Sequence, residues 1–127
     1  KIIQDLTALK KGKDIRNYQI SHIFGRTKNI YTFTAPWNIV FKPKILDPFT
    51  GHEAKGDMVK EYQELFFNQS YKRFKNYIED YNELITSHIL TTKIENYLDK
   101  IQNSLSEKDF KKFKIALLSE LSPIQPN

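Results

Sequence analysis

Two short segments of the chain have the pattern of β-strands. Residues 18–23 alternate between apolar and polar side chains, and residues 37–42 are rich in β-branched and aromatic residues. Gly25 follows the first segment and Pro43 closes the second. We therefore predict two short antiparallel strands, joined by a loop over residues 25–36.

The rest of the chain has helical spacing. Thr50 followed by Glu53 forms a capping-box pattern, which predicts a helix that starts at Thr50. Apolar residues then recur three and four positions apart nearly to the C-terminus, with an interruption expected at residues 68–70. Ser106 is predicted to cap the last helix. Three or four packed helices are thus expected after the strands, and the fold class is α+β.

The positive charge is concentrated near the strands. The net charge is +5, from 20 basic and 15 acidic residues. Residues 1–56 hold ten basic and four acidic residues (+6), and residues 57–127 hold ten and eleven (−1). We interpret the first part as a basic segment with both strands and the start of the next helix, and the second as a helical lobe packed on it in one compact domain. A polyanion is a natural partner for such a segment, and solvated surface lysines are the plainer alternative.

The composition narrows the class of protein. Hydrophobic residues make up 39% of the chain, with nine Phe and seven Tyr, which favours a folded core over disorder. The chain has no cysteine, so disulfides, zinc–thiolate sites and a cysteine nucleophile are excluded. It has neither a long apolar run nor a signal peptide, so we expect no membrane span and a cytoplasmic location. Its first residue, Lys1, favours an excised domain of a longer protein.

Two histidines and an asparagine lie in the basic segment. His22 is near the end of the first predicted strand, Asn38 is in the second, and His52 is in the first turn expected after Thr50. Hydrolysis of a phosphodiester needs a base for water and a cation that stabilises charge on the phosphate. A histidine can be that base, since its reference pKa is about 6.5, and another can bind the metal. An asparagine can orient the base or supply a neutral oxygen ligand.

Residues 18–56 resemble the HNH motif, the ββα-metal nuclease fold. In that family a base histidine ends the first strand, an asparagine lies on or near the second, and a final histidine opens the helix. Here His22, Asn38 and His52 occupy those places. The segments most similar to HNH-type restriction endonucleases are residues 36–39 and 49–53. The resemblance implies a small ββα-metal core with a helical C-terminal lobe, and a restriction-type endonuclease that cleaves double-stranded DNA with a divalent metal ion, Mg²⁺.

The resemblance also implies roles for individual residues. His22 and Asn38 would be catalytic, and His52 would bind the metal. Ser21 stands where many members carry an acidic metal ligand, so Asp47, Glu53 or Asn38 would complete the metal site with water. Five basic residues near the site are expected to contact DNA phosphates: Arg26, Lys28, Lys42, Lys44 and Lys55.

Other interpretations remain open from the sequence. Each histidine could be an ordinary polar residue, bonded to backbone in a strand or at a helix start. The main alternative is a non-catalytic nucleic-acid-binding or protein-interaction domain of a larger protein. A nuclease requires His22 and His52 to face one cleft, with Asn38 within bonding reach. The sequence leaves the oligomeric state open, with a homodimer as one alternative.

Overall fold

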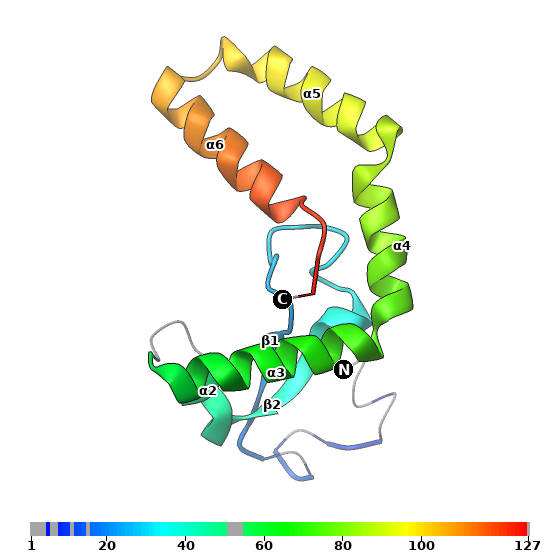
Figure 1. The fold of residues 1–127 in the computed structure, drawn as a ribbon, viewed down its shortest axis with the longest axis vertical. Coiled ribbons are helices and arrows are strands. Elements are labelled where there is room, and N and C mark those ends of the chain that lie inside the picture. Colours follow the sequence, from blue (N-terminus) through cyan, green and yellow to red (C-terminus); the bar gives the residue numbers. More distant parts are fainter. Residues whose placement is uncertain (1–4, 6–7, 11, 15, 51–54, 127) are drawn as a thin grey trace.

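The computed structural model describes residues 5, 8–10, 12–14, 16–50 and 55–126 (Figure 1). Its elements, in chain order, are β1 (Tyr18–His22), the 3-10 helix η1 (Pro36–Asn38), β2 (Ile39–Pro43), the 3-10 helix η2 (Lys44–Leu46), α2 (Asp47–Thr50), α3 (Asp57–Arg73), α4 (Lys75–Thr86), α5 (His88–Gln102) and α6 (Glu107–Glu120). These elements confirm the predicted α+β class.

The two strands form an antiparallel hairpin, as predicted. Tyr18 pairs with Pro43 at one end, and His22 pairs with Ile39 at the other. The backbone N–H of Ile23 donates to the carbonyl of Asn38 at 2.8 Å, which continues the pairing one step beyond β1. His22 therefore lies at the end of the hairpin from which the long connecting loop departs.

The helix starts differ in part from the prediction. Thr50 is the last residue of α2 and not the cap of a helix, because α2 already begins at Asp47. The rest of the predicted capping box lies in residues 51–54, outside the described residues. Ser106 caps α6 as predicted, since its Oγ accepts from the backbone N–H of Asp109 at 3.2 Å.

The expected interruption at residues 68–70 is wrong. Helix α3 runs through these residues without a break and ends at Phe74, whose φ of −108° and ψ of 17° leave the helical region. Asn, Gln and Ser have only a modest helix penalty, which tertiary packing overrides. Here Phe67 and Tyr71 pack against the core from either side of this polar run.

The core joins the long loop, α4 and the C-terminal segment. Its buried residues are Phe24, Ile78, Tyr81, Ile85 and Ile124. Ile124 follows α6, yet its side chain is only 2% exposed. Asn82 of α4 fixes this segment, because its side chain both accepts from and donates to the backbone of Ile124 at 2.8 Å.

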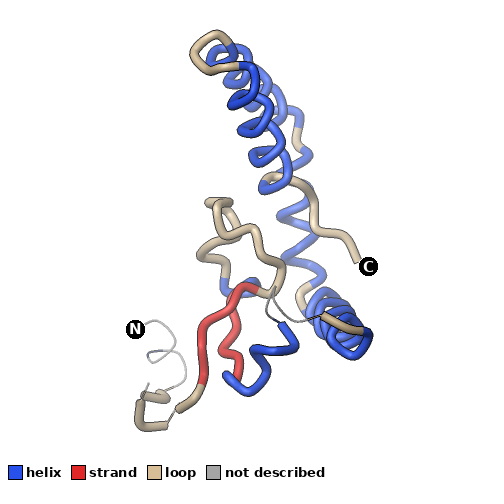
Figure 2. The backbone as a smooth tube through the Cα atoms, turned by 90° about the vertical axis from the view of Figure 1, so that its left-hand side faces the viewer, coloured by secondary structure: helices blue, strands red, loops and turns tan. Residues whose placement is uncertain are grey.

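Helices α4, α5 and α6 extend away from the hairpin. Helix α3 lies beside the hairpin, α4 leaves its end, and α5 and α6 form a helical pair that returns toward the long loop (Figures 1 and 2). Within the described part of the chain, we find no helix that is long and apolar enough to cross a membrane. The hairpin, the long loop and α3 are neighbours in both views, and His22 lies where the hairpin passes into the loop (Figures 1 and 2).

Candidate functional site

A cavity of about 310 Å³ lies where the end of the hairpin meets α3. The lining residues are Ser21, His22, Ile23, Gly25 and Lys42 from the hairpin and loop, and Gln63, Phe66 and Phe67 from α3. The candidate base His22 thus borders a space that could admit water and part of a substrate. Its surroundings combine a hydroxyl, an amide and an ammonium group with aromatic rings.

The long loop orients the imidazole of His22. Its Nε2 lies 2.9 Å from the carbonyl oxygen of Phe33, and the two rings stack with centroids 5.3 Å apart and 18° between their planes. A carbonyl can only accept, so Nε2 must carry the hydrogen. In the neutral ring, the lone pair is then on Nδ1. His22 is therefore held in the tautomer whose Nδ1 can accept a proton.

Asn38 fixes the backbone immediately after His22. Its side chain is 0% exposed; its Oδ1 accepts from the backbone N–H of Phe24 at 2.8 Å, and its Nδ2 donates to the carbonyls of Gly25 and Thr32, both at 3.1 Å. Of the two predicted roles, orientation of the base fits this geometry. The role of a metal ligand does not, because the side chain is buried and committed to the backbone. Asn38 is thus a positioning residue.

Two further buried polar residues hold the loop, and the sequence analysis missed both. Thr32 donates through Oγ1 to the carbonyl of Arg26 at 2.9 Å, while Asn29 donates to the hydroxyl of Tyr81 at 2.9 Å and to the carbonyl of Glu120 at 2.7 Å. Polar residues in a loop are ordinarily exposed, so their type gave no signal of burial. These bonds immobilise the loop that carries Phe33, and so they help to fix His22.

The environment of Tyr81 shifts its ionisation. Burial raises the pKa of the phenol above its usual value of 10.0, and the carboxylate of Glu120 adds to this. The Arg26 guanidinium and the hydrogen bond from Asn29 oppose it. The hydroxyl also donates to the carbonyl of Ser122 at 3.2 Å. Tyr81 therefore stays neutral and links α4, the loop and the C-terminal segment.

Arg26, which was predicted to contact DNA, is engaged in hydrogen bonds within the protein. Its guanidinium donates to the Ser119 carbonyl, to the hydroxyl of Ser122 at 2.6 Å and to the carbonyl of Pro123 at 2.9 Å. Carbonyl groups at a helix C-terminus lack partners within the helix and attract cations. Arg26 is therefore occupied in tying the loop to the end of α6.

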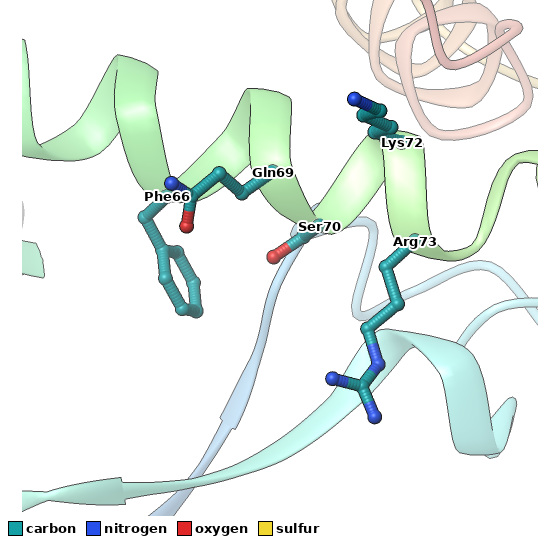
Figure 3. A pocket seen from close by; sticks show the side chains of 5 residues that line it. All are labelled: Phe66, Gln69, Ser70, Lys72 and Arg73. Carbon is teal, nitrogen blue, oxygen red and sulfur yellow. The ribbon is translucent and has the colours of Figure 1, made fainter.

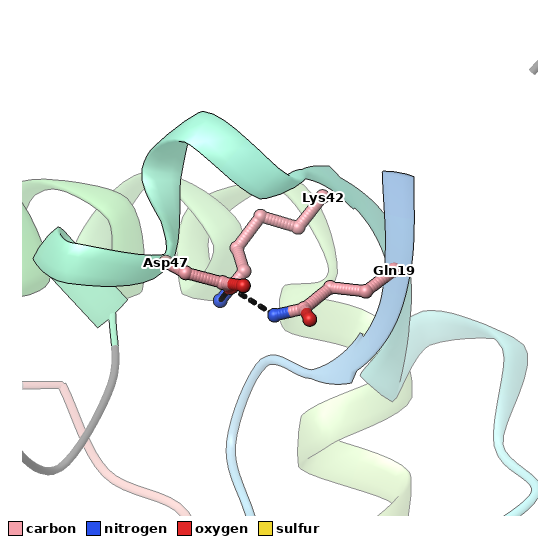
Figure 4. Close-up of polar contacts among 3 residues, drawn as sticks. All are labelled: Gln19, Lys42 and Asp47. Atoms are coloured by element: carbon pink, nitrogen blue, oxygen red, sulfur yellow. Dashed lines mark hydrogen bonds and ion pairs between the residues drawn. The ribbon is translucent and has the colours of Figure 1, made fainter. Parts of the chain in front are cut away.

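Lys42 also differs from a surface phosphate contact. The residue is only 6% exposed, and its Nζ lies 3.0 Å from the carboxylate of Asp47. The side-chain amide of Gln19 donates to the same carboxylate (Figure 4). Lys42 accordingly contributes charge to the wall of the His22 cavity and holds the hairpin against α2. The remaining three predicted contacts, Lys28, Lys44 and Lys55, are exposed.

Two of the four predicted metal ligands lie outside the described residues. This applies to His52 and Glu53, and therefore also to the expected shared cleft of His22 and His52. Asp47 is described, and its carboxylate is engaged by Lys42 and Gln19. The part of the chain that the structure describes contains no cluster of three or more His, Cys, Asp or Glu that could hold a metal ion.

The fold and the site define a small α+β protein in which a buried asparagine and a fixed loop hold a histidine at the edge of a cavity. The chain belongs to the family described as "Uncharacterised protein PM1201", which matches residues 1–126. A curated relative, "Uncharacterized protein PM1201" of Pasteurella multocida (strain Pm70), is 43% identical over 109 residues. These cover 83% of this chain and 50% of the relative, so the chain spans about half the length of that relative. No solved structure matches the chain significantly.

Proposed function

We propose that the chain carries the nuclease site of a metal-dependent DNA endonuclease, with His22 as the general base. The geometry of His22 supports this most directly. The ring borders a cavity of about 310 Å³, and the hydrogen bond from Nε2 to the Phe33 carbonyl leaves the lone pair on Nδ1. The resemblance of residues 18–56 to the HNH motif supplies the reaction type, and its restriction-type variant supplies the substrate, double-stranded DNA.

His22 would take a proton from the attacking water through Nδ1. As it does so, the ring becomes an imidazolium, and both of its nitrogens are then donors. The hydrogen bond from Nε2 to the carbonyl of Phe33 becomes charge-assisted and therefore stronger. The water oxygen forms a bond to phosphorus as the bond to the leaving oxygen breaks. The loop thus keeps the ring in one orientation while the proton is transferred.

The remaining parts of the proposal concern charge. A divalent ion, Mg²⁺ held through His52, would stabilise the charge that develops on the phosphate and the leaving oxygen. Lys42 lines the same cavity, but its ammonium group is paired with the carboxylate of Asp47 and is not proposed as a phosphate contact. Lys28, Lys44 and Lys55 would bind flanking phosphates, which position a duplex without reading its sequence.

Cleavage of supercoiled plasmid tests the proposal. The purified chain should nick or linearise the plasmid with MgCl₂ present and should leave it intact with EDTA. Agarose gel electrophoresis over a time course gives the rate. Binding of the duplex without cleavage at any Mg²⁺ or Mn²⁺ concentration would refute the nuclease and would favour a non-catalytic nucleic-acid-binding domain.

A further inference from the structure

A second cavity adjoins the one at His22. It has a volume of about 450 Å³ and is lined by Phe66, Gln69, Ser70, Lys72 and Arg73, all from the last turns of α3 (Figure 3). Phe66 also lines the His22 cavity, so the two hollows meet at this ring. A ligand in the first cavity could therefore continue along α3 into the second.

The second cavity is positively charged. The described residues that line the two cavities include Lys72, Arg73 and Lys42, and no Asp or Glu is among them. Lys72 and Arg73 are exposed, and neither forms an ion pair with any residue that the structure describes. Basic residues in the last turn of a helix interact favourably with the helix dipole, which explains in general why they occur there. It does not account for a basic hollow that shares Phe66 with the His22 cavity.

Arg73 is placed to bind a phosphate group. Its side chain extends on the same side of α3 as Phe66 and Ser70 (Figure 3), and its guanidinium carbon lies 5.8 Å from the centre of the Phe74 ring. This cation–π contact restricts the side chain without using its N–H donors. A planar guanidinium can then donate two parallel hydrogen bonds to phosphate oxygens. Gln69 adds an amide that can donate to the same backbone.

The spacing suits a nucleic-acid strand. From Phe66 to Arg73 the helix rises about 10 Å, at 1.5 Å per residue. Successive phosphates of one DNA strand advance about 3.4 Å along the duplex axis, so this distance is long enough to reach a phosphate next to the one in the His22 cavity. We infer that Lys72 and Arg73 bind the DNA backbone beside the phosphate in the His22 cavity. This inference rests on the proposed function for the identity of the polyanion.

Duplex binding across a salt series tests the inference. The probe is a fluorescent 20-bp DNA duplex, and the protein carries His22→Ala so that the duplex stays intact. Lys72→Ala with Arg73→Ala should lower the slope of log affinity against log salt by about 1.8, at 0.9 per phosphate contact. The parent should bind the duplex more tightly than the double variant, and this ratio of affinities should fall about twelvefold between 50 and 200 mM KCl.

Lys111→Ala with Lys112→Ala is the matched control. It removes the same charge from exposed residues in the first half of α6, away from α3 in both views (Figures 1 and 2). This control should keep the parental slope. Arg73→Lys should keep the slope but weaken binding, since it retains the charge and loses the planar donor pair. Thermal unfolding confirms that every variant is folded.

The outcomes separate this inference from the proposed function. Equal slopes for the parent and the Lys72/Arg73 variant, or an equal decrease in the control, would overturn the inference, as would a parent that binds no duplex. A selective decrease in the Lys72/Arg73 variant supports it, even if the protein with His22 intact fails to cleave plasmid. In that case only the nuclease proposal is refuted, and the backbone-binding surface on α3 stands.

Discussion

The asparagine at position 38 shows how a buried amide can serve a site that it does not touch. In a loop, backbone groups lack the partners that a helix or sheet provides, and the Asn38 side chain supplies them. It accepts from the N–H of Phe24 and donates to the carbonyls of Gly25 and Thr32. Unpaired buried groups cost about 1–3 kcal/mol each. The amide thus makes one loop conformation strongly preferred, and this conformation brings the Phe33 carbonyl to His22.

Asn38→Asp should destabilise the protein, although the two side chains have nearly the same shape. The substitution keeps the acceptor for the Phe24 N–H but places an oxygen where Nδ2 donates to two carbonyls. We expect a loss of about 2–4 kcal/mol in the free energy of unfolding, measured by urea denaturation at pH 7. Asn96→Asp, an exposed site on α5, is the control and should change stability by less than about 0.5 kcal/mol. Equal stability of Asn38→Asp and the parent would contradict the buried network.

Residue types predicted the candidates but not their partners. His22 and Asn38 could be selected because imidazole and amide groups suit this chemistry, and because both lie at predicted strand ends. The link between them could not be predicted, since it passes through Phe33 and depends on the fold of a loop without regular secondary structure. The partners of Arg26 could not be predicted for the same reason: they are more than 90 residues away in the sequence.

At the scale of elements, the long loop and α6 depend on each other. The backbone of Arg26 is left-handed, with φ of +54°, which is uncommon for a residue other than glycine. Its guanidinium nevertheless bonds to several groups at and beyond the end of α6, and the carboxylate of Glu120 accepts from the backbone N–H of Lys28 at 3.1 Å. The loop therefore supplies hydrogen-bond partners to polar groups at and beyond the C-terminus of α6.

Arg26→Ala should destabilise the protein, because the Ser119 and Pro123 carbonyls and the Ser122 hydroxyl each lose a charged donor. We expect a loss of about 2–3 kcal/mol, since hydrogen bonds from charged groups contribute about 1.5–3 kcal/mol. Lys28→Ala removes the same charge from an exposed side chain nearby and should leave stability unchanged. Thermal unfolding of the two variants measures the difference. Similar melting temperatures for both would show that Arg26 does not tie the loop to α6.

Periodicity predicted the elements better than their ends. The hairpin and the helices of the C-terminal part follow from alternation and from helical spacing. The break between α3 and α4 is at Phe74 and not at the polar run that precedes it. A break of this kind is set by packing of neighbouring turns against the core, which a local pattern does not contain.

At the scale of the whole molecule, the long loop and the C-terminal segment are joined in one core. Ile124 packs with Phe24, and Tyr81 links both regions through its hydroxyl. The charge asymmetry between residues 1–56 and 57–127 therefore does not mark two separate surfaces. The basic hollow on α3 belongs to the second part by sequence but adjoins the His22 cavity of the first.

The difference in stability between Tyr81→Phe and the parent should depend on pH. Because the pKa of Tyr81 is raised on folding, its contribution to stability is complete below pH 10 and is lost as pH rises through the folded-state pKa. At pH 7 the variant should be less stable by about 1–2 kcal/mol, since it loses the bonds of the hydroxyl. The gap should narrow above pH 10, because only the parent then loses stability through this phenol.

Urea denaturation of both proteins from pH 7 to pH 11 measures the gap. Tyr77→Phe, at an exposed position on the same helix, serves as the control for tyrosine ionisation and should show no gap at either pH. A gap for Tyr81→Phe that stays constant through pH 11 would contradict the raised pKa.

The role of His22 as base is the central claim, and the rate of plasmid cleavage by His22→Ala tests it most directly. The account predicts that this variant binds duplex as the parent does but cleaves about 10²–10⁴ times more slowly with MgCl₂, as expected for the loss of a general base. His88→Ala, which removes an exposed histidine at the start of α5, should cleave at the parental rate. Equal cleavage by His22→Ala and the parent would contradict the account.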